Sequence, residues 1–347
     1  MKKQIFLLAF ILLAAGQAFS QKTIAVQSNG TATFHTDWAS AWAATQAGDT
    51  IYLPGGTFNI GYFTIDKPVA IIGVGHDPTQ THDGLFSHLN GTIYLAEGSD
   101  NTLLHGFQLG NLYFYANYLN QAVSNITISR CRVTGAVNMG YTAPSPVQHV
   151  LFTENVLINV NGFNAQNIQF YKNIIDGYIQ QFNGTTIFSN NIFTFGYYSS
   201  WTWHLPIRNV KNSLFQNNIF RVDNNPLDGN CLNNLIQNNI FLKNFTPDPQ
   251  TDENIWQANF FGQTFDNVFV NYLTGPFNPD FDYHLLSTSV GVNAGVDGFD
   301  IGIFGTAIPY KEGAVPFNPQ IIFEQVSNQT DEAGNISVQV EVESQSR

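Results

Sequence analysis

Few residues in this sequence could act as a general acid or base. Asp223 and Asp228 are the only carboxylates whose position suggests the pair that a glycoside hydrolase needs. Arg130, Glu154 and Lys172 could supply the base, metal ligand and charge neutralisation that a uronate lyase uses. We favour a structural interpretation for these three, in which charges of alternating sign form weak ion pairs on an exposed face. No catalytic residue is therefore predicted.

Large aromatic side chains crowd one segment, 197–203. An exposed loop normally avoids such residues unless they pack on one another or meet a partner. The C–H faces of sugar rings stack on aromatic rings, and amide side chains can hydrogen-bond sugar hydroxyls. The predicted substrate-binding residues are Tyr197, Tyr198, Trp201, Trp203, Asn164 and Gln180. The alternative is that the aromatic residues pack over the outer face of the fold. A second aromatic stretch occupies residues 112–118.

Histidines and aspartates gather in a glycine-containing stretch, 76–88. They are His76, Asp77, His82, Asp83 and His88. Imidazole and carboxylate groups are zinc-type ligands, but this spacing fits no established ligand pattern. We therefore predict a polar surface loop, with no metal and no cofactor.

A sequence repeat between residues 124 and 241 indicates the fold that must position these candidate site residues. Its anchor residues are Cys131, Asn155, Asn173, Asn191, Asn218 and Asn239, separated by 24, 18, 18, 27 and 21 residues. The third residue before each anchor and the second after it are always apolar. Periods near 20 residues indicate a solenoid, and short runs of Ile, Val and Phe broken by Asn and Gly favour strands.

Five of the six anchors are asparagine, which can satisfy a buried turn and hydrogen-bond the same residue on the next coil. The sequence thereby resembles the right-handed parallel β-helix proteins of the pectate-lyase-like superfamily, whose coils carry such an asparagine ladder. We predict an all-β, right-handed parallel β-helix solenoid. The resemblance covers most of the chain and is specific for the fold, not for an activity.

In that superfamily the catalytic cleft usually follows the first strand of each coil. By this resemblance the strand falls at 136–139, 162–165, 178–182, 203–207 and 227–231. The outward candidates there are Asn138, Asn164 and Gln180, whose amides cannot serve as acid or base near neutral pH. The paired-aspartate and Gly-His-Gly motifs of polygalacturonase-like members are absent, as is the Arg-x-Pro-x-x-Arg pattern of pectate lyases.

The chain divides into four predicted parts. Residues 1–20 have the basic start, apolar run and small-residue end of a cleaved secretory signal. Residues 21–50 form an N-terminal cap with a short helix at 37–46 that carries Trp38 and Trp42. The β-helix spans 51–306 and includes a closing coil at 282–302. Residues 307–347 form a connector that is followed by a pair of strands. This pair is predicted to form a β-hairpin-like extension.

The charge and cysteine content of the sequence limit the kinds of binding partner and of covalent cross-link that we expect. The net charge is −12, and 11 basic against 25 acidic residues remain after residues 1–20, so a nucleic acid is excluded as a partner. Cys131 and Cys231 lie four or five coils apart and are predicted to be free thiols. We predict a secreted, non-catalytic protein of the cell surface, the extracellular space or the periplasm, with no transmembrane segment in the mature chain. Its predicted partner is a polysaccharide or cell-surface glycan, and the alternative is a polysaccharide lyase or glycoside hydrolase.

Overall fold

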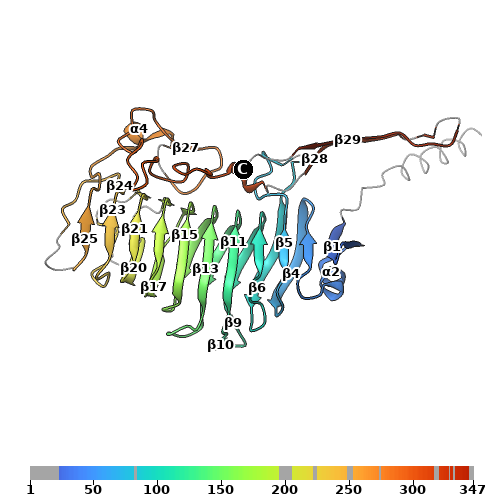
Figure 1. The fold of residues 1–347 in the computed structure, drawn as a ribbon, viewed down its shortest axis with the longest axis horizontal. Coiled ribbons are helices and arrows are strands. Elements are labelled where there is room, and N and C mark those ends of the chain that lie inside the picture. Colours follow the sequence, from blue (N-terminus) through green and yellow to red (C-terminus); the bar gives the residue numbers. More distant parts are fainter. Residues whose placement is uncertain are drawn as a thin grey trace, which may run out of the picture.

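Two long parallel sheets form the body of the protein and follow one common axis (Figure 1). The computed structural model describes residues 23–81, 84–194, 205–221, 225–247, 253–272, 275–315, 320–327, 329–330 and 333–343. One sheet has twelve strands and the other eleven. Successive coils pair in parallel register, as between Ile128 and Phe152 and between Phe152 and Phe170. The predicted all-β parallel β-helix is confirmed.

The strands alternate between the two sheets along the chain. The twelve-stranded sheet has the order β2 (Thr31–His35), β1 (Ile24–Ser28), β3 (Thr50–Tyr52), β5 (Ala70–Ile72), β7 (Leu103–His105), β11 (Ser124–Ser129), β13 (Gln148–Thr153), β15 (Gln166–Tyr171), β18 (Ile187–Ser189), β21 (Leu214–Gln216), β23 (Leu235–Gln237) and β25 (Ile255–Gln257). The eleven-stranded sheet has the order β4 (Gly56–Ile65), β6 (Ser87–Leu95), β8 (Gln108–Tyr113), β12 (Arg132–Asn138), β14 (Val156–Asn161), β16 (Ile174–Ile175), β19 (Ile192–Phe193), β22 (Ile219–Phe220) and β24 (Ile240–Phe241), with β17 (Ile179–Asn183) and β20 (Ile207–Lys211) branching from β14.

The predicted asparagine ladder lies at the turn between the two sheets, and Asn173 shows its pattern. The Oδ1 atom of Asn173 accepts hydrogen bonds from the backbone N and the Nδ2 of Asn155, both at 2.9 Å. Its Nδ2 donates to the carbonyl of Phe152 at 2.9 Å and to Oδ1 of Asn191 at 3.0 Å. The ladder continues to Asn259, one coil beyond the last predicted anchor.

Phenylalanine side chains stack inside the coils at the two apolar positions of the repeat. One stack consists of Phe152, Phe170, Phe188 and Phe215, with ring centroids 4.5 to 5.0 Å apart and planes within 7°. A second stack consists of Phe193, Phe220, Phe241 and Phe261, with centroids 4.5 to 5.1 Å apart. Nearly parallel rings at these centroid distances attract one another, so the stacks help to hold each coil in register with its neighbours.

The N-terminal end of the solenoid carries the predicted capping helix, α2 (Trp38–Ala44). The Asp37 carboxylate accepts from the backbone N of Ser40 at 2.9 Å and caps the helix. Trp38 is buried, and the rings of Trp38 and Trp42 both pack edge-on against Phe63. The tryptophans therefore close the apolar interior at this end.

A column of apolar side chains lies on the outside of the eleven-stranded sheet. Its members are the residues that follow the ladder, namely Val156, Ile174, Ile192, Ile219 and Ile240. They point outward yet are at most 2% exposed. Their cover is the return segment, residues 264–315, which supplies Phe269, Tyr272, Tyr283 and Ile301 to a second hydrophobic core.

The return segment runs back along the ladder turns, from the last coils towards the first (Figure 1). It contains α4 (Phe265–Val268), β26 (Phe269–Asn271), β27 (Asp282–Leu285) and the 3-10 helix η2 (Glu312–Ala314). Residues 282–302 are not the predicted closing coil, because β27 pairs antiparallel with β26 and the stacked strands end at β25. The sequence-based division into domains at residues 50 and 306 stays a prediction.

Arg130, Glu154 and Lys172 form ion pairs, as predicted, but not on an exposed face. The Glu154 carboxylate lies 2.8 Å from Nε of Arg130 and 2.8 Å from Nζ of Lys172. All three residues are at most 5% exposed because the return segment covers them. Arg130 donates to the carbonyl of Val315 and Lys172 to that of Ile308, at 2.6 and 2.5 Å. The predicted weak surface ladder is therefore wrong, and a buried charge cluster binds the return segment.

The C-terminal part contains the predicted hairpin. Strands β28 (Gln320–Val326) and β29 (Val338–Glu343) pair antiparallel. Cys131 and Cys231 are buried and free, as predicted. Within the described ranges, no helix is long and apolar enough to cross a membrane.

Candidate functional site, a tyrosine-lined groove

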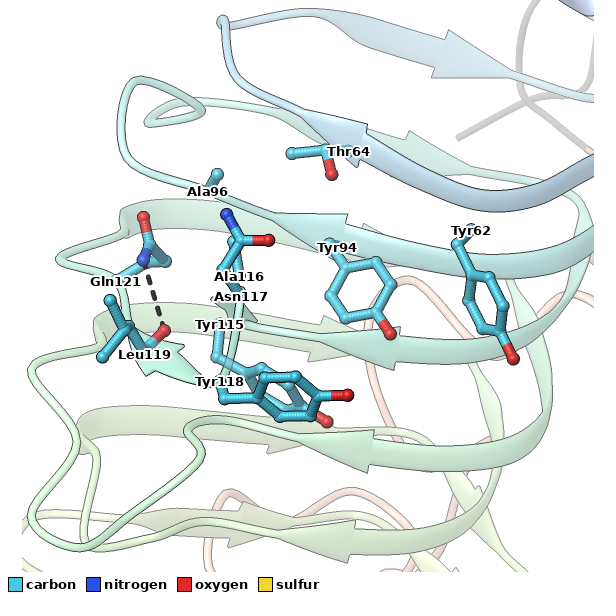
Figure 2. A pocket seen from close by; sticks show the side chains of 10 residues that line it. All are labelled: Tyr62, Thr64, Tyr94, Ala96, Tyr115, Ala116, Asn117, Tyr118, Leu119 and Gln121. Carbon is cyan, nitrogen blue, oxygen red and sulfur yellow. Dashed lines mark hydrogen bonds between the residues drawn. The ribbon is translucent and has the colours of Figure 1, made fainter.

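A groove of about 500 Å³ opens on the outer face of the eleven-stranded sheet, over its first coils (Figure 2). Four of its ten lining residues are tyrosines. Tyr62 comes from β4 and Tyr94 from β6, while Tyr115 and Tyr118 come from a small hairpin that follows β8. Thr64 and Gln121 add polar groups. Figure 2 shows Tyr62 and Tyr94 side by side on neighbouring strands, with Tyr115 and Tyr118 beside them.

Six tyrosines form one continuous cluster around the groove. They are Tyr62, Tyr94, Tyr113, Tyr115, Tyr118 and Tyr141. Successive ring centroids lie 5.1 to 6.4 Å apart, and Tyr113 stacks on Tyr115 with planes 11° apart. Tyr62 is 86% exposed and Tyr118 74% exposed. Aromatic rings in contact with one another but open to solvent form the kind of patch that marks an interaction site.

Tyr118 adopts a backbone conformation that its side chain disfavours. It lies in the two-residue turn between β9 (Tyr115–Ala116) and β10 (Leu119–Asn120), with φ of 49° at Asn117 and 62° at Tyr118. A turn with two positive φ values suits Asn followed by Gly, whereas a bulky residue there is strained. Such strain tends to gather at functional sites.

The groove continues into a column of outward side chains along the sheet. Strand register aligns, coil by coil, Thr64, Tyr94, Tyr113, Asn138, Asn161, Gln180 and Arg208. None of these side chains is fully buried. Rungs of a parallel sheet are about 4.8 Å apart, so the six steps from Thr64 to Arg208 span about 29 Å. The column is thus an extended strip that begins with the hydroxyl of Thr64, continues with two phenols and three amides, and ends with a guanidinium group.

The amides of the column are hydrogen-bonded to one another. Gln180 Nε2 donates to Asn161 Oδ1, and Asn161 Nδ2 donates to Asn138 Oδ1, both at 2.5 Å. Gln180 is therefore on the outward face, as predicted. Asn164 is not, because β14 ends at Asn161 and Asn164 follows in a turn with φ of 61°.

The predicted strand at 162–165 is displaced by the register of the neighbouring coil. Val133 pairs with Leu157 and Ala136 with Asn159, so β12 holds one residue more than β14 between these two pairs. A fixed count from the anchor cannot reveal that bulge. Asn161, the last residue of β14, carries the column at this coil.

The predicted aromatic site cannot be compared with the groove. Tyr197, Tyr198, Trp201 and Trp203 lie outside the residues that the structure describes. Three tyrosines of the cluster, Tyr113, Tyr115 and Tyr118, lie in the aromatic stretch 112–118, for which the sequence predicted no role. Tyr62 and Tyr94 lie in other coils and are brought together by the register of β4 and β6, while Tyr141 lies in a bend after β12 and contacts Tyr115 and Tyr118.

The phenols of Tyr94, Tyr113 and Tyr115 remain uncharged well above neutral pH. Burial raises the pKa of Tyr94, Tyr113 and Tyr115, and the neighbouring phenols raise it further. Each hydroxyl can therefore donate and accept a hydrogen bond at once. The groove offers flat apolar rings with neutral polar groups at their edges.

Acid–base chemistry has little support in the described part of this face. The Oδ1 of Asp228 accepts from the backbone N of Asn209 at 2.9 Å and of Asn230 at 3.1 Å, so it holds a loop together. Asp223 lies outside the described residues. The Arg208 guanidinium lies 4.2 Å over the ring of Tyr178, and its Nε donates to the carbonyl of Leu205.

Potential metal ligands occur elsewhere. Asp282, His284 and Glu312 on the return segment place one ligand atom each within 4.8 Å of the others, all at least partly exposed. In the stretch 76–88, His76 and Asp77 are buried rather than on the predicted surface loop, while His82 and Asp83 lie outside the described residues. Burial lowers the pKa of His76 to about 4, which keeps the imidazole neutral.

Comparison with known proteins provides no further guide to the groove. No family model matches this sequence, and no curated protein matches it. The groove is therefore interpreted from its own geometry.

Proposed function

We propose that this chain is a secreted, non-catalytic parallel β-helix protein that binds a polysaccharide along the tyrosine groove and the column beyond it. One observation carries the proposal. Tyr118 is 74% exposed at the groove and is held at a positive φ where glycine would be less strained. A residue retained against its backbone preference, with its ring open to solvent, is best explained by a partner that uses the ring.

The dimensions of the groove support an extended ligand. The coils of Tyr62, Tyr94, Tyr113 and Asn138 are three rung steps of about 4.8 Å apart, which spans about 14 Å, the scale of a short oligosaccharide. Phenol rings can stack on the apolar faces of sugars, and the amides of Asn161 and Gln180 can hydrogen-bond hydroxyls further along. A chain parallel to the solenoid axis would meet both kinds of group.

Origin and location are part of the same proposal. The predicted secretory signal at residues 1–20 would deliver the protein to the cell surface or the surrounding medium, where polysaccharides occur. The asparagine ladder and the stacked parallel strands support membership of the pectate-lyase-like superfamily. Fold alone does not assign an activity, so the binding proposal depends on the groove.

Replacement of Tyr118 by glycine tests the site directly. Tyr118→Gly creates the Asn-Gly turn that this hairpin geometry favours, and it removes one ring contact, with Tyr141 at 5.5 Å. These effects on stability oppose each other, so the free energy of unfolding should stay within about 1 kcal/mol of the parent value. We expect binding in a polysaccharide array, followed by affinity electrophoresis, to weaken at least tenfold.

Phe34→Ala serves as the matched control, because Phe34 is 69% exposed on β2, outside the groove lining. Binding should be unchanged in this variant. The proposal fails if the parent binds a polysaccharide and Tyr118→Gly binds it equally well. A large loss of stability in Tyr118→Gly would instead assign the ring to packing.

The alternative enzymatic function has its own assay. Polysaccharides incubated with the protein, with and without calcium, should give neither new reducing ends nor the absorbance of unsaturated products. Product formation would replace the binding proposal by a lyase or hydrolase, and Arg208→Gln and Asp228→Asn would then be the first variants to examine.

A further inference from the structure

We infer that the groove selects an uncharged glycan and rejects acidic polysaccharides. This inference rests on the proposed function and specifies its substrate class. No lysine or arginine of the described chain lines the groove, and its polar groups are phenols, amides and a hydroxyl. A uronate carboxylate bound there would lose water without gaining a cationic partner, which is costly.

The rim of the groove adds negative charge. Asp66 and Glu97 are exposed, and each lies within two residues of a lining residue, Thr64 and Ala96. The backbone N of Glu97 donates to Oε1 of Gln121, a lining residue, at 3.2 Å, so Glu97 is fixed at the edge. Figure 2 shows Ala96 and Gln121 together on the side of the groove away from Tyr62. Acidic polymers approaching this side meet charges of their own sign.

The lysine next to Asp66 does not neutralise the negative charge of the rim. Lys67 follows Asp66 in the chain, but its Nζ donates to the carbonyl of Thr45 at 2.6 Å and lies 4.2 Å over the ring of Trp42. The lysine is thereby directed to the capping helix and away from the groove. The chain as a whole carries a net charge of −12, which acts in the same direction.

The surface separates three classes of glycan by charge. Neutral polymers stack on the tyrosines without an electrostatic contribution, so their affinity is independent of salt. Polyuronates are repelled, and screening by salt weakens that repulsion. Cationic amino sugars would be attracted by Asp66 and Glu97, but no carboxylate lines the groove to hold an ammonium group.

The experiment compares neutral glucan, xylan and mannan oligosaccharides with oligogalacturonate and with a cationic chitosan oligosaccharide. Affinities are measured calorimetrically at 20 and 500 mM NaCl for the parent, for Asp66→Lys with Glu97→Lys, and for Glu253→Lys with Asp266→Lys. The second pair makes the same charge change on exposed residues outside the groove lining. Tyr118→Gly reports whether any binding uses the groove.

We expect a neutral oligosaccharide to bind the parent with less than a twofold change between the two salt concentrations. The rim variant should keep that affinity and gain at least tenfold in oligogalacturonate binding at low salt, whereas the control pair should not. Oligogalacturonate or chitosan binding more tightly to the parent than every neutral glycan, and lost in Tyr118→Gly, overturns the inference and leaves the binding function standing. Absence of any groove-dependent binding overturns both.

Discussion

The buried charge cluster offers the sharpest test of how the return segment is held. Glu154 is 5% exposed and supplies the single carboxylate between Arg130 and Lys172. Its Oε2 also accepts from the backbone N of Lys311 at 3.2 Å. Burial lowers the pKa of Arg130, and Glu154 opposes that shift. Glu154→Gln keeps the shape of the side chain but removes the negative charge that both buried cations contact.

The size of the effect follows from those contacts. Removing one member of a buried ion pair costs about 3–5 kcal/mol, because the remaining charge is not solvated. Two cations lose the same charged contact here, although the glutamine carbonyl can still accept one hydrogen bond. We therefore expect Glu154→Gln to lower the free energy of unfolding by about 3–5 kcal/mol, a large share of the stability of a typical domain.

Urea unfolding followed by circular dichroism measures this loss. Glu253→Gln is the control, since Glu253 is exposed and should change stability by less than about 0.5 kcal/mol. Arg130→Met, Glu154→Leu and Lys172→Met combined should restore much of the loss, because an apolar cluster requires no counter-charge. A change of less than about 1 kcal/mol in Glu154→Gln would refute the assignment of the cluster as a buried clamp.

Three further expectations follow from other buried groups. Asn173→Ala removes the acceptor of the backbone N of Asn155 and one of the two acceptors of its Nδ2, which keeps its bond to the carbonyl of Ile128. Each lost partner costs about 1–3 kcal/mol, so urea unfolding should show a loss of about 2–6 kcal/mol, against less than about 1 kcal/mol for the exposed Asn183→Ala. Burial lowers the pKa of His76 to about 4 from 6.5, so on acidification the unfolded chain binds a proton before the folded protein does. The free energy of unfolding should therefore fall by up to about 3 kcal/mol between pH 6.5 and 4. A His76→Gln variant with the same dependence of stability on pH would contradict this. Burial raises the pKa of Cys131 to about 12, so this thiol should react with Ellman's reagent only after unfolding, and rapid reaction of the native protein would show that it is accessible.

The repeat made the solenoid predictable because its physics is local. An apolar residue three before the anchor and another two after it define the inner faces of two strands, and the asparagine between them defines the turn. The return segment was not predicted, although the repeat carries a signal for it at the residue directly after the anchor. At Val156 and Ile174 that residue is apolar, although it faces outward. An outward apolar column requires a cover, and this signal was present in the sequence.

The groove could not be derived in the same way. Tyr62, Tyr94 and Tyr141 are separated by segments of unequal length, and bulges shift the register between β6, β8 and β12. Side-chain direction alternates with every residue of a strand, so one inserted residue decides whether a tyrosine faces the groove or the interior. Asn164 was predicted to face outward, but it lies in the turn after β14, and Asn161 is the outward residue of that coil.

The path of the return segment also determines how the molecule can fold. A simple solenoid gains stability coil by coil from nearest neighbours and can fray from either end. Here Arg130 contacts Val315 across 185 residues, and Asn238 contacts Ala294, so one segment connects early and late coils. Closing such distant contacts is entropically slow. During synthesis the outward column from Val156 to Ile240 emerges first and stays bare until residues 264–315 have followed, which makes this interval the one in which the chain is most exposed to aggregation.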